Sequence, residues 1–290
     1  LRGLLITQPY NGTPEKVESF YKEAINAFCR SKSTVDCLDF GNKSSGVLAD
    51  LAAALYEIGL YNEAQILYQH IVDKINLLID FEDPDSDPAK ASIHNVHFKL
   101  GLIHMKRGNI DMAIDNYNNA LKIIGQSKED EDYWLITLYG KLGFTYYYNN
   151  DFENASSYFL KSLSFYNTCD DCQEADLIIL KCYYGLLELL TGNLDTSEKA
   201  IHTAESWLKE HPLNKEDHYD YDAYLLYWPL HIYYDKLNQS DKATKYLKMA
   251  YDIIGKEKIE KYNKHPEKDT HPEFFYCRDI IKAYESSLNQ

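Results

Sequence analysis

The amino-acid sequence predicts an all-α protein built as a solenoid of helix-turn-helix repeats. The first observation is that five segments align with one another without a gap; they begin at Gly59, Gly108, Asn150, Gly192 and Asn238. Gly and Asn tolerate the left-handed backbone conformation that ends many helices. The second observation is that small or apolar residues then recur four positions apart, as at Ala113 and Tyr117 or Ala155 and Phe159. Because this spacing is typical of an amphipathic helix, each segment predicts a turn followed by about 15 residues of helix.

Residues 1–43 precede the first complete repeat, and we predict that they form an N-terminal cap or half repeat. Thr13 supplies a hydroxyl that can cap a helix, Pro14 fits the first helical turn, and Glu15 favours the positive end of the helix dipole. Residues 21–28 then show the spacing of the second helix of a repeat, without a clear first helix before them.

Residues 44–255 predict five repeats, because an apolar stretch of helix length precedes each aligned segment. These first helices are predicted at residues 48–58, 94–107, 136–149, 178–191 and 222–237. In three of them a glycine, namely Gly101, Gly143 or Gly185, lies seven residues before the turn. A glycine has no side chain to hold the helices apart, so the two helices of each repeat are expected to touch there.

Three features interrupt the repeat pattern. Residues 80–88 contain two prolines and five carboxylates, and residues 211–221 form a longer insertion, so both are predicted as loops. Pro229 falls inside the predicted first helix of the fifth repeat. Proline lacks the N–H that makes the helical hydrogen bond, so a kink is expected there.

We predict that residues 256–290 form a linker followed by a capping helix. The segment 270–273 spells a capping box, and Ile280, Ile281 and Tyr284 lie on one face of the helix that follows. That helix is expected to cover the last repeat, because the ends of a solenoid need a cap.

The sequence resembles the tetratricopeptide repeat (TPR) superfamily over nearly its whole length. That family places an aromatic residue, Leu-Gly and a second aromatic residue on the first helix, and Ala, an aromatic residue and Ala on the second. One repeat matches at Tyr139, Leu142, Gly143, Tyr146, Ala155 and Phe159, and another at Leu100, Gly101, Ala113, Tyr117 and Ala120. The resemblance implies that the helix pairs stack into a continuous right-handed superhelical solenoid.

The repeats are longer than the usual TPR unit. Equivalent positions lie 49, 42, 42 and 46 residues apart, at Ala64, Ala113, Ala155, Ser197 and Ala243. The usual spacing is about 34 residues. The long repeat is similar in length to the TPR units of kinesin light chains. This likeness in spacing does not imply that the chain shares their cargo function.

Composition and charge narrow the classes of partner. The chain has 290 residues, of which 45% are hydrophobic and 26% charged, a profile typical of a soluble globular protein. The 30 basic and 45 acidic residues give a net charge of −15, which disfavours nucleic acid and anionic membranes as partners. No signal peptide and no apolar stretch of about 18 residues is evident. A cytoplasmic location is therefore predicted.

The candidate chemical motifs do not complete a catalytic, metal or cofactor site. Cys169 and Cys172 form a C-x-x-C pair without the further ligands that zinc needs. His94 and His97 lie one helical turn apart, and His97 occupies a position where a packed residue is expected. The sequence therefore predicts no enzyme activity, no cofactor and no metal.

The TPR likeness places the residues that flank the Leu-Gly pair on the inner, concave surface. The candidate partner-binding residues are Phe98, Leu102, Phe144, Tyr147, Tyr148, Leu186, Leu189, Trp228 and Ile232. They are apolar or aromatic, and the cations with which some TPR domains grip a terminal carboxylate are missing from these positions. A basic or amphipathic protein or peptide would bury such a groove. The alternative is that the protein's own helices cover this face.

These observations predict a protein–protein interaction scaffold that binds a peptide or helical segment of a partner in its groove. The alternative is the regulatory or sensing region of a larger signalling protein whose catalytic or DNA-binding domain lies outside this sequence.

Overall fold

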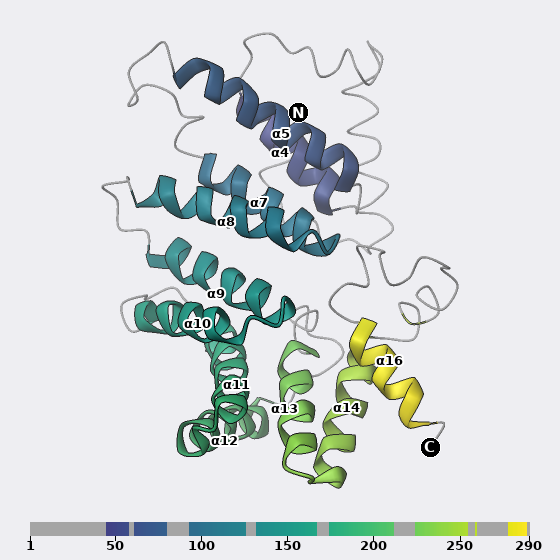
Figure 1. Cartoon of the computed structure of the whole chain (residues 1–290). Helices are drawn as coiled ribbons and strands as arrows, with labels where there is room; N and C mark the ends of the chain where they lie inside the picture. The colour runs from purple at the N-terminus through teal and green to yellow at the C-terminus, as the bar shows by residue number, and fades with distance from the viewer. Residues whose placement is uncertain are drawn as a thin grey trace. The chain divides into compact units, whose positions relative to one another are not determined.

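The computed structural model describes the chain in eight stretches. They comprise residues 45–57, 61–79, 93–125, 132–166, 174–211, 224–254, 259 and 278–288. Eleven α-helices account for nearly all of these residues, and no strand occurs within them (Figure 1). The all-α fold class predicted from the sequence is confirmed.

The first ten described helices form five sequential pairs, as the repeat pattern predicts. The first helices of the pairs are α4 (Ser45–Glu57), α7 (Ile93–Lys106), α9 (Asp132–Tyr148), α11 (Glu174–Thr191) and α13 (Tyr224–Lys236). The second helices are α5 (Tyr61–Ile79), α8 (Ile110–Ile124), α10 (Phe152–Phe165), α12 (Leu194–Glu210) and α14 (Ser240–Ile254). The paired helices α4 and α5, α9 and α10, α11 and α12, and α13 and α14 pack against each other, and α11 also contacts both α10 and α13. In the remaining pair, Gly101 of α7 approaches Tyr117 of α8.

The turn between two paired helices has the left-handed residue that the sequence predicts. The backbone φ angles are 71°, 60°, 90° and 56° at Gly108, Asn150, Gly192 and Asn238. At the last of these turns the N–H of Asn238 donates to the carbonyl of Asp235, and the N–H of Gln239 donates to the carbonyl of Tyr234. The same pair of hydrogen bonds closes the other three turns, and it satisfies carbonyls that the end of a helix would otherwise leave free. The fifth predicted turn residue, Gly59, lies outside the described residues.

The helices of a pair touch at the glycines that the sequence singles out. A Cβ atom added to Gly143 would lie 2.5 Å from Cδ1 of Phe159, and one added to Gly101 would collide with the ring of Tyr117. A Cβ on Gly185 would lie 2.7 Å from a side chain of α12. Because carbon atoms pack about 3.5–4.0 Å apart, only glycine permits these approaches.

The described residues group into two compact units, each with its own apolar core. The N-terminal unit contains α4, α5, the part of α7 up to Ile103 and the segment Asp115–Gly125. The C-terminal unit contains the segment His104–Ile114 and the helices from α9 onward. The partner-binding residues predicted on α9, α11 and α13 all belong to the C-terminal unit.

A last helix, α16 (Arg278–Ser287), packs against α14. Ile280 and Ile281 are fully buried in the core of the C-terminal unit, and the capping box predicted before this helix lies outside the described residues. Pro229 lies within α13, and the helix continues past it to Lys236.

Several sequence expectations fall on residues that the structure does not describe. They are the N-terminal cap in residues 1–43, the loops at 80–88 and 212–221, and the C-x-x-C pair. None of the helices in the described stretches is both long and apolar enough to cross a lipid bilayer.

Candidate partner-binding surface

The nine predicted partner-binding residues divide by burial. Leu186 is fully buried and Phe98 is only 9% exposed, which corrects the expectation that these two lie on an open surface. The other seven are partly exposed: Leu102, Phe144, Tyr147, Tyr148, Leu189, Trp228 and Ile232. Leu102 belongs to the N-terminal unit. We call the remaining six, which come from α9, α11 and α13, the partner surface.

The aromatic residues of α9 gather around one buried tyrosine of α11, Tyr183. Phe144 meets Tyr183 edge to face with ring centroids 4.8 Å apart, and Tyr147 does so at 5.1 Å. Phe144 also meets the buried Phe159 of α10 edge to face, at 5.1 Å. This geometry is favourable for aromatic rings. These contacts fix the orientation of the Phe144 and Tyr147 rings.

Tyr183 is a residue that the sequence reasoning missed. It is fully buried, and burial, with Tyr148 and Tyr147 next in effect, raises its pKa well above the ordinary value for tyrosine. Burial also raises the pKa of Tyr147, with smaller contributions from Asp279 of α16 and Cys182 of α11. Both phenols therefore stay neutral, and act as apolar bodies with one polar atom.

The α13 part of the partner surface is anchored on one side. The indole of Trp228 lies beside the His231 ring, with centroids 5.2 Å apart. Nδ1 of His231 is 3.1 Å from the carbonyl oxygen of Ala243 on α14, and burial lowers the pKa of His231. A neutral imidazole tied to α14 therefore holds the Trp228 ring on one face.

A pocket of about 230 Å³ lies between α9 and α11, next to Phe144. Its apolar lining comes from Ile136, Gly140, Phe144, Ile179 and Leu180, and its polar lining from Tyr133, Thr137, Lys141, Tyr166 and Asp176. Tyr133 is 57% exposed at the rim. Burial raises the pKa of Tyr166, and the nearby Asp176 and Tyr133 add to the effect. The pocket thus combines an apolar floor with hydroxyl, ammonium and carboxylate groups that can orient a bound side chain.

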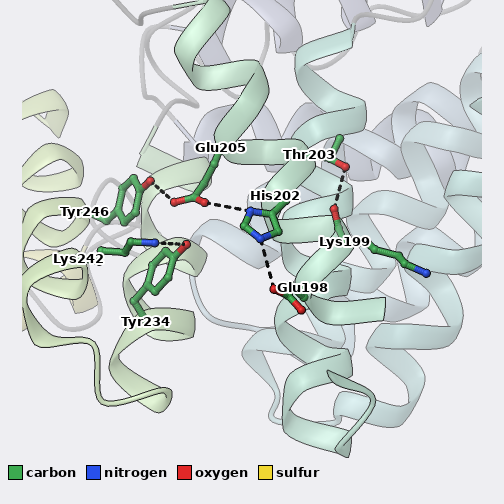
Figure 2. Close-up of polar contacts among 8 residues, drawn as sticks. All are labelled: Glu198, Lys199, His202, Thr203, Glu205, Tyr234, Lys242 and Tyr246. Atoms are coloured by element: carbon green, nitrogen blue, oxygen red, sulfur yellow. Dashed lines mark hydrogen bonds and ion pairs between the residues drawn. The ribbon is translucent and has the colours of Figure 1, made fainter. Parts of the chain in front are cut away.

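Figure 2 shows a second group of polar residues, where α12 meets α13 and α14. The hydroxyl of Tyr246 donates to Oε1 of Glu205 at 2.7 Å. Lys242 donates to the hydroxyl of Tyr234 at 3.1 Å and also lies 4.3 Å from the centre of that ring. The Tyr234 and Tyr246 rings stack with centroids 5.7 Å apart. The hydrogen bond between Glu205 and Tyr246 joins the fourth repeat to the fifth, and the other contacts lie within the fifth repeat.

Glu205 is the centre of this group, and its side chain is only 13% exposed. Burial opposes its ionisation, but the Tyr246 and Tyr234 hydroxyls, together with Lys242 and His202, outweigh burial and lower the pKa of Glu205. Burial and the same carboxylate raise the pKa values of Tyr234 and Tyr246. The pKa values of all three groups are shifted away from pH 7, whereas an acid–base catalyst needs a pKa near the working pH. We interpret the group as a structural link between repeats.

The histidine motif has a packing role. Nδ1 of His97 lies 3.1 Å from Oδ1 of Asn116, and burial lowers the pKa of His97. In the part of the chain that the structure describes, no three His, Cys, Asp or Glu side chains are arranged to hold a metal ion.

Part of the chain is similar to a known repeat family. Residues 91–168 match the tetratricopeptide repeat family. The peptidyl-prolyl cis-trans isomerase FKBP4 of Bos taurus is 23% identical over 167 residues, which make up 57% of this chain and 34% of that protein. The chain therefore spans about a third of the length of this relative.

Two solved structures share the fold. BtubC (BKLC) from P. vanneervenii has a TM-score of 0.55 and 16% identity, with 89% of this chain and 95% of that chain covered. The apo form of the quorum sensor NprR from B. thuringiensis has a TM-score of 0.52 and 14% identity, with 82% and 72% covered.

Proposed function

We propose that this chain, whose residues 91–168 match the tetratricopeptide repeat family, is a protein-interaction module that binds a peptide or helical segment of a partner protein. The proposed site is the partner surface together with the pocket that adjoins Phe144. The observation that carries the proposal is that six apolar or aromatic side chains from three successive first helices stay partly exposed, and that one of them, Phe144, lines a pocket. Apolar patches that remain exposed in this way mark interaction sites more often than they occur by chance.

The size of the pocket favours a side chain over a free small molecule. Pockets for drug-sized ligands span about 300–1,000 Å³, whereas this one measures about 230 Å³. A large apolar side chain of the partner would enter between α9 and α11, and neighbouring apolar residues of the partner would cover Tyr147 and Trp228. An amphipathic helix or an extended peptide provides such a row of anchors.

Charge favours a basic partner. The chain carries a net charge of −15, whereas the pocket itself is lined by one carboxylate, Asp176, and one ammonium group, Lys141. Complementary charge acts mainly by speeding the encounter, so association should slow as salt is raised. We propose no catalytic role and no cofactor, since the pKa of Glu205 is lowered and that of Tyr246 is raised, both away from neutral pH.

The test compares three alanine variants with the wild type. The first measurement is the amount of partner protein that each captures, and the second is the affinity of each for a captured segment. Trp228→Ala removes an anchor of the partner surface, and Tyr133→Ala removes the exposed rim of the pocket. Leu160→Ala is the matched control, because Leu160 is 47% exposed on α10 outside the surface. Loss of a central aromatic anchor is expected to cost about 2 kcal/mol, or roughly thirtyfold in Kd. The melting temperature should remain close to that of the wild type.

The core variant Leu186→Ala separates binding from stability. Leu186 is fully buried, so this change is expected to lower the melting temperature through a cavity. If Trp228→Ala and Tyr133→Ala capture partners as the wild type does, or lose them only in proportion to unfolding, the binding surface lies elsewhere.

A further inference from the structure

The pocket between α9 and α11 changes in character from its floor to its rim. Three of its lining residues, Ile136, Ile179 and Leu180, are between 4% and 8% exposed and supply only apolar side chains. In contrast, Tyr133 is 57% exposed, and Asp176 is also exposed. The floor of the pocket is therefore apolar, whereas polar groups stand at its opening.

The described residues at the floor provide little hydrogen bonding for a bound side chain. Gly140 contributes only backbone, and a Cβ added to it would lie 3.3 Å from Cδ2 of Leu180 and 3.6 Å from Oγ of Ser162. The Ser162 hydroxyl is already engaged, because it donates to the carbonyl oxygen of Ile136 at 2.8 Å. A polar atom brought to the floor would lose its water without gaining a partner, which is costly. The tip of the bound side chain is therefore expected to be apolar.

The rim presents a hydrogen-bond acceptor and a donor from two different helices. The carboxylate of Asp176 belongs to α11, and the ammonium group of Lys141 belongs to α9. Tyr166, just after α10, adds a phenol that stays neutral, because burial and then the charge of Asp176 raise its pKa. The negative and positive charges at the rim cancel, so the pocket favours neither a cation nor an anion. A neutral group that both donates and accepts a hydrogen bond suits both walls.

The peptide backbone is a neutral group of this kind. Each residue other than proline carries one N–H donor and one C=O acceptor. In an extended segment these groups are open to a binding site, as they are when a peptide adds to the edge of a sheet. Inside a helix they are already bonded to residues four positions away, so a helix presents only side chains to the rim. The rim therefore favours an extended segment over a helix.

We propose that the pocket binds a phenylalanine of a partner segment in extended conformation, with the ring on the apolar floor, a backbone N–H donating to Asp176 and a backbone carbonyl accepting from Lys141. This inference rests on the proposed function, because it names the anchor and the conformation of the partner at the same site. An aromatic anchor suits the pocket because Phe144 lines it, and aromatic rings pack favourably edge to face. Tyrosine is disfavoured because its hydroxyl would reach the floor.

The experiment uses N-acetyl-phenylalanine N-methylamide as a probe, because it has one side chain between two backbone amides. The full-length chain carries isotope-labelled isoleucine and leucine methyl groups, and NMR titration should shift the methyl signals of Ile136, Ile179 and Leu180. The tyrosine analogue of the probe brings a hydroxyl to the floor. An ester analogue, in which oxygen replaces the N–H next to the side chain, removes the donor for Asp176. Each analogue is expected to bind roughly tenfold more weakly than the probe.

Asp176→Ala tests the role of the rim. In this variant the probe and its ester analogue should bind equally, because the acceptor for the N–H is gone. Glu174→Ala is the matched control, since Glu174 is exposed on the same helix outside the pocket lining. In the control the roughly tenfold preference for the amide should remain. Equal binding of the probe and either analogue by the wild type would overturn the proposal, and this measurement requires no variant.

Two synthetic peptides with a central phenylalanine test the conformation of the partner. One is unconstrained, and the other is locked as a helix by a hydrocarbon staple on the face away from the phenylalanine. The unconstrained peptide should bind the full-length chain more tightly and shift the same methyl signals. Equal or tighter binding of the stapled peptide in the pocket would show that the partner segment does not need to be extended.

The outcomes separate this inference from the proposed function. If the wild type captures a partner through Trp228 but the probe leaves the methyl signals of the pocket unchanged, the inference is wrong and the function stands. If the probe binds with the expected preferences but no captured protein depends on Trp228 or Tyr133, the chemistry of the pocket is correct and the proposed function is wrong.

Discussion

A single carboxylate, that of Glu205, joins helices of two neighbouring repeats. Glu205 lies on α12 and accepts a hydrogen bond from Tyr246 of α14, while Tyr234 of α13 lies beside the same group. Hydrogen bonds to an ionised acceptor are stronger than those between neutral groups. Glu205 is therefore expected to stabilise the junction of the repeats while it is ionised.

The stability that Glu205 contributes should be lost at acidic pH. Folding lowers the pKa of Glu205, so the contribution is present above the pKa of an unfolded glutamate, about 4.3, and disappears as the pH falls through the folded pKa. The difference in free energy of unfolding between the wild type and Glu205→Gln should therefore shrink between pH 7 and pH 3. Urea unfolding at several pH values measures it.

The exposed Glu198 provides the control for this measurement. Its side chain is 66% exposed on the same helix. Glu198→Gln removes one acidic charge from α12 but leaves the hydrogen bond between Tyr246 and Glu205 in place, so the difference between this variant and the wild type should depend less on pH. A difference for Glu205→Gln that stays constant to pH 3 would contradict the role assigned to the ionised carboxylate.

The sequence predicts which residues of a helix are apolar, but not which of them are covered by a neighbour. Leu186 and Ile232 occupy corresponding places in the repeat pattern, six residues before the turn residues Gly192 and Asn238, yet Leu186 is fully buried and Ile232 is partly exposed. Tyr183 stands in an apolar run with nothing to mark it as the centre of the aromatic cluster. Glu205 is a charged residue within an amphipathic helix, where the sequence predicts a solvated side chain. Burial at these positions is decided by packing between repeats.

At the scale of the element, most of the fold follows from local pattern. The first helix of the third repeat is predicted at residues 136–149 and extends from Asp132 to Tyr148. The differences lie at helix ends, as they do for α5 and α12, which are longer than the 15 residues expected. Periodicity identifies the helix, whereas its end depends on capping and on contacts with other helices.

Gly143 tests the close contact within a helix pair. We expect Gly143→Ala to lower the free energy of unfolding by about 1–3 kcal/mol, because the new methyl group would overlap the buried ring of Phe159. Helix propensity alone would give the opposite sign, a gain of about 1 kcal/mol for alanine over glycine. Urea denaturation measures the change.

Two comparisons support the interpretation of that measurement. Gly125→Ala should be close to neutral, since a Cβ there would lie no nearer than 3.4 Å to another atom. In a Phe159→Leu background the Gly143→Ala change should cost less, because the ring that it meets is gone. An equal cost in both backgrounds would mean that Phe159 is not the source of the clash.

At the scale of the whole molecule, stability is divided between two apolar cores. Leu67 belongs to the core of the N-terminal unit and Leu187 to that of the C-terminal unit. In repeat proteins, contacts within and between adjacent repeats carry most of the stability, so damage tends to stay local.

We therefore expect core substitutions to loosen their own unit. Leu67→Ala should accelerate hydrogen exchange mainly in α4 and α5, and Leu187→Ala mainly in α11 to α14, each with a cost of about 2–5 kcal/mol. Mass spectrometry of peptic fragments locates the change. Uniform acceleration along the described helices in either variant would show instead that the chain unfolds as one cooperative block.

The position of α16 also has a consequence for synthesis. The helices α4 to α14 pair with partners next to them in sequence, so each hairpin can form as soon as its second helix leaves the ribosome. The site that buries Ile280 and Ile281 is complete before α16 has been made. A nascent chain therefore passes through an interval in which this apolar site is open to solvent. During that interval, docking of α16 competes with aggregation and with capture by chaperones.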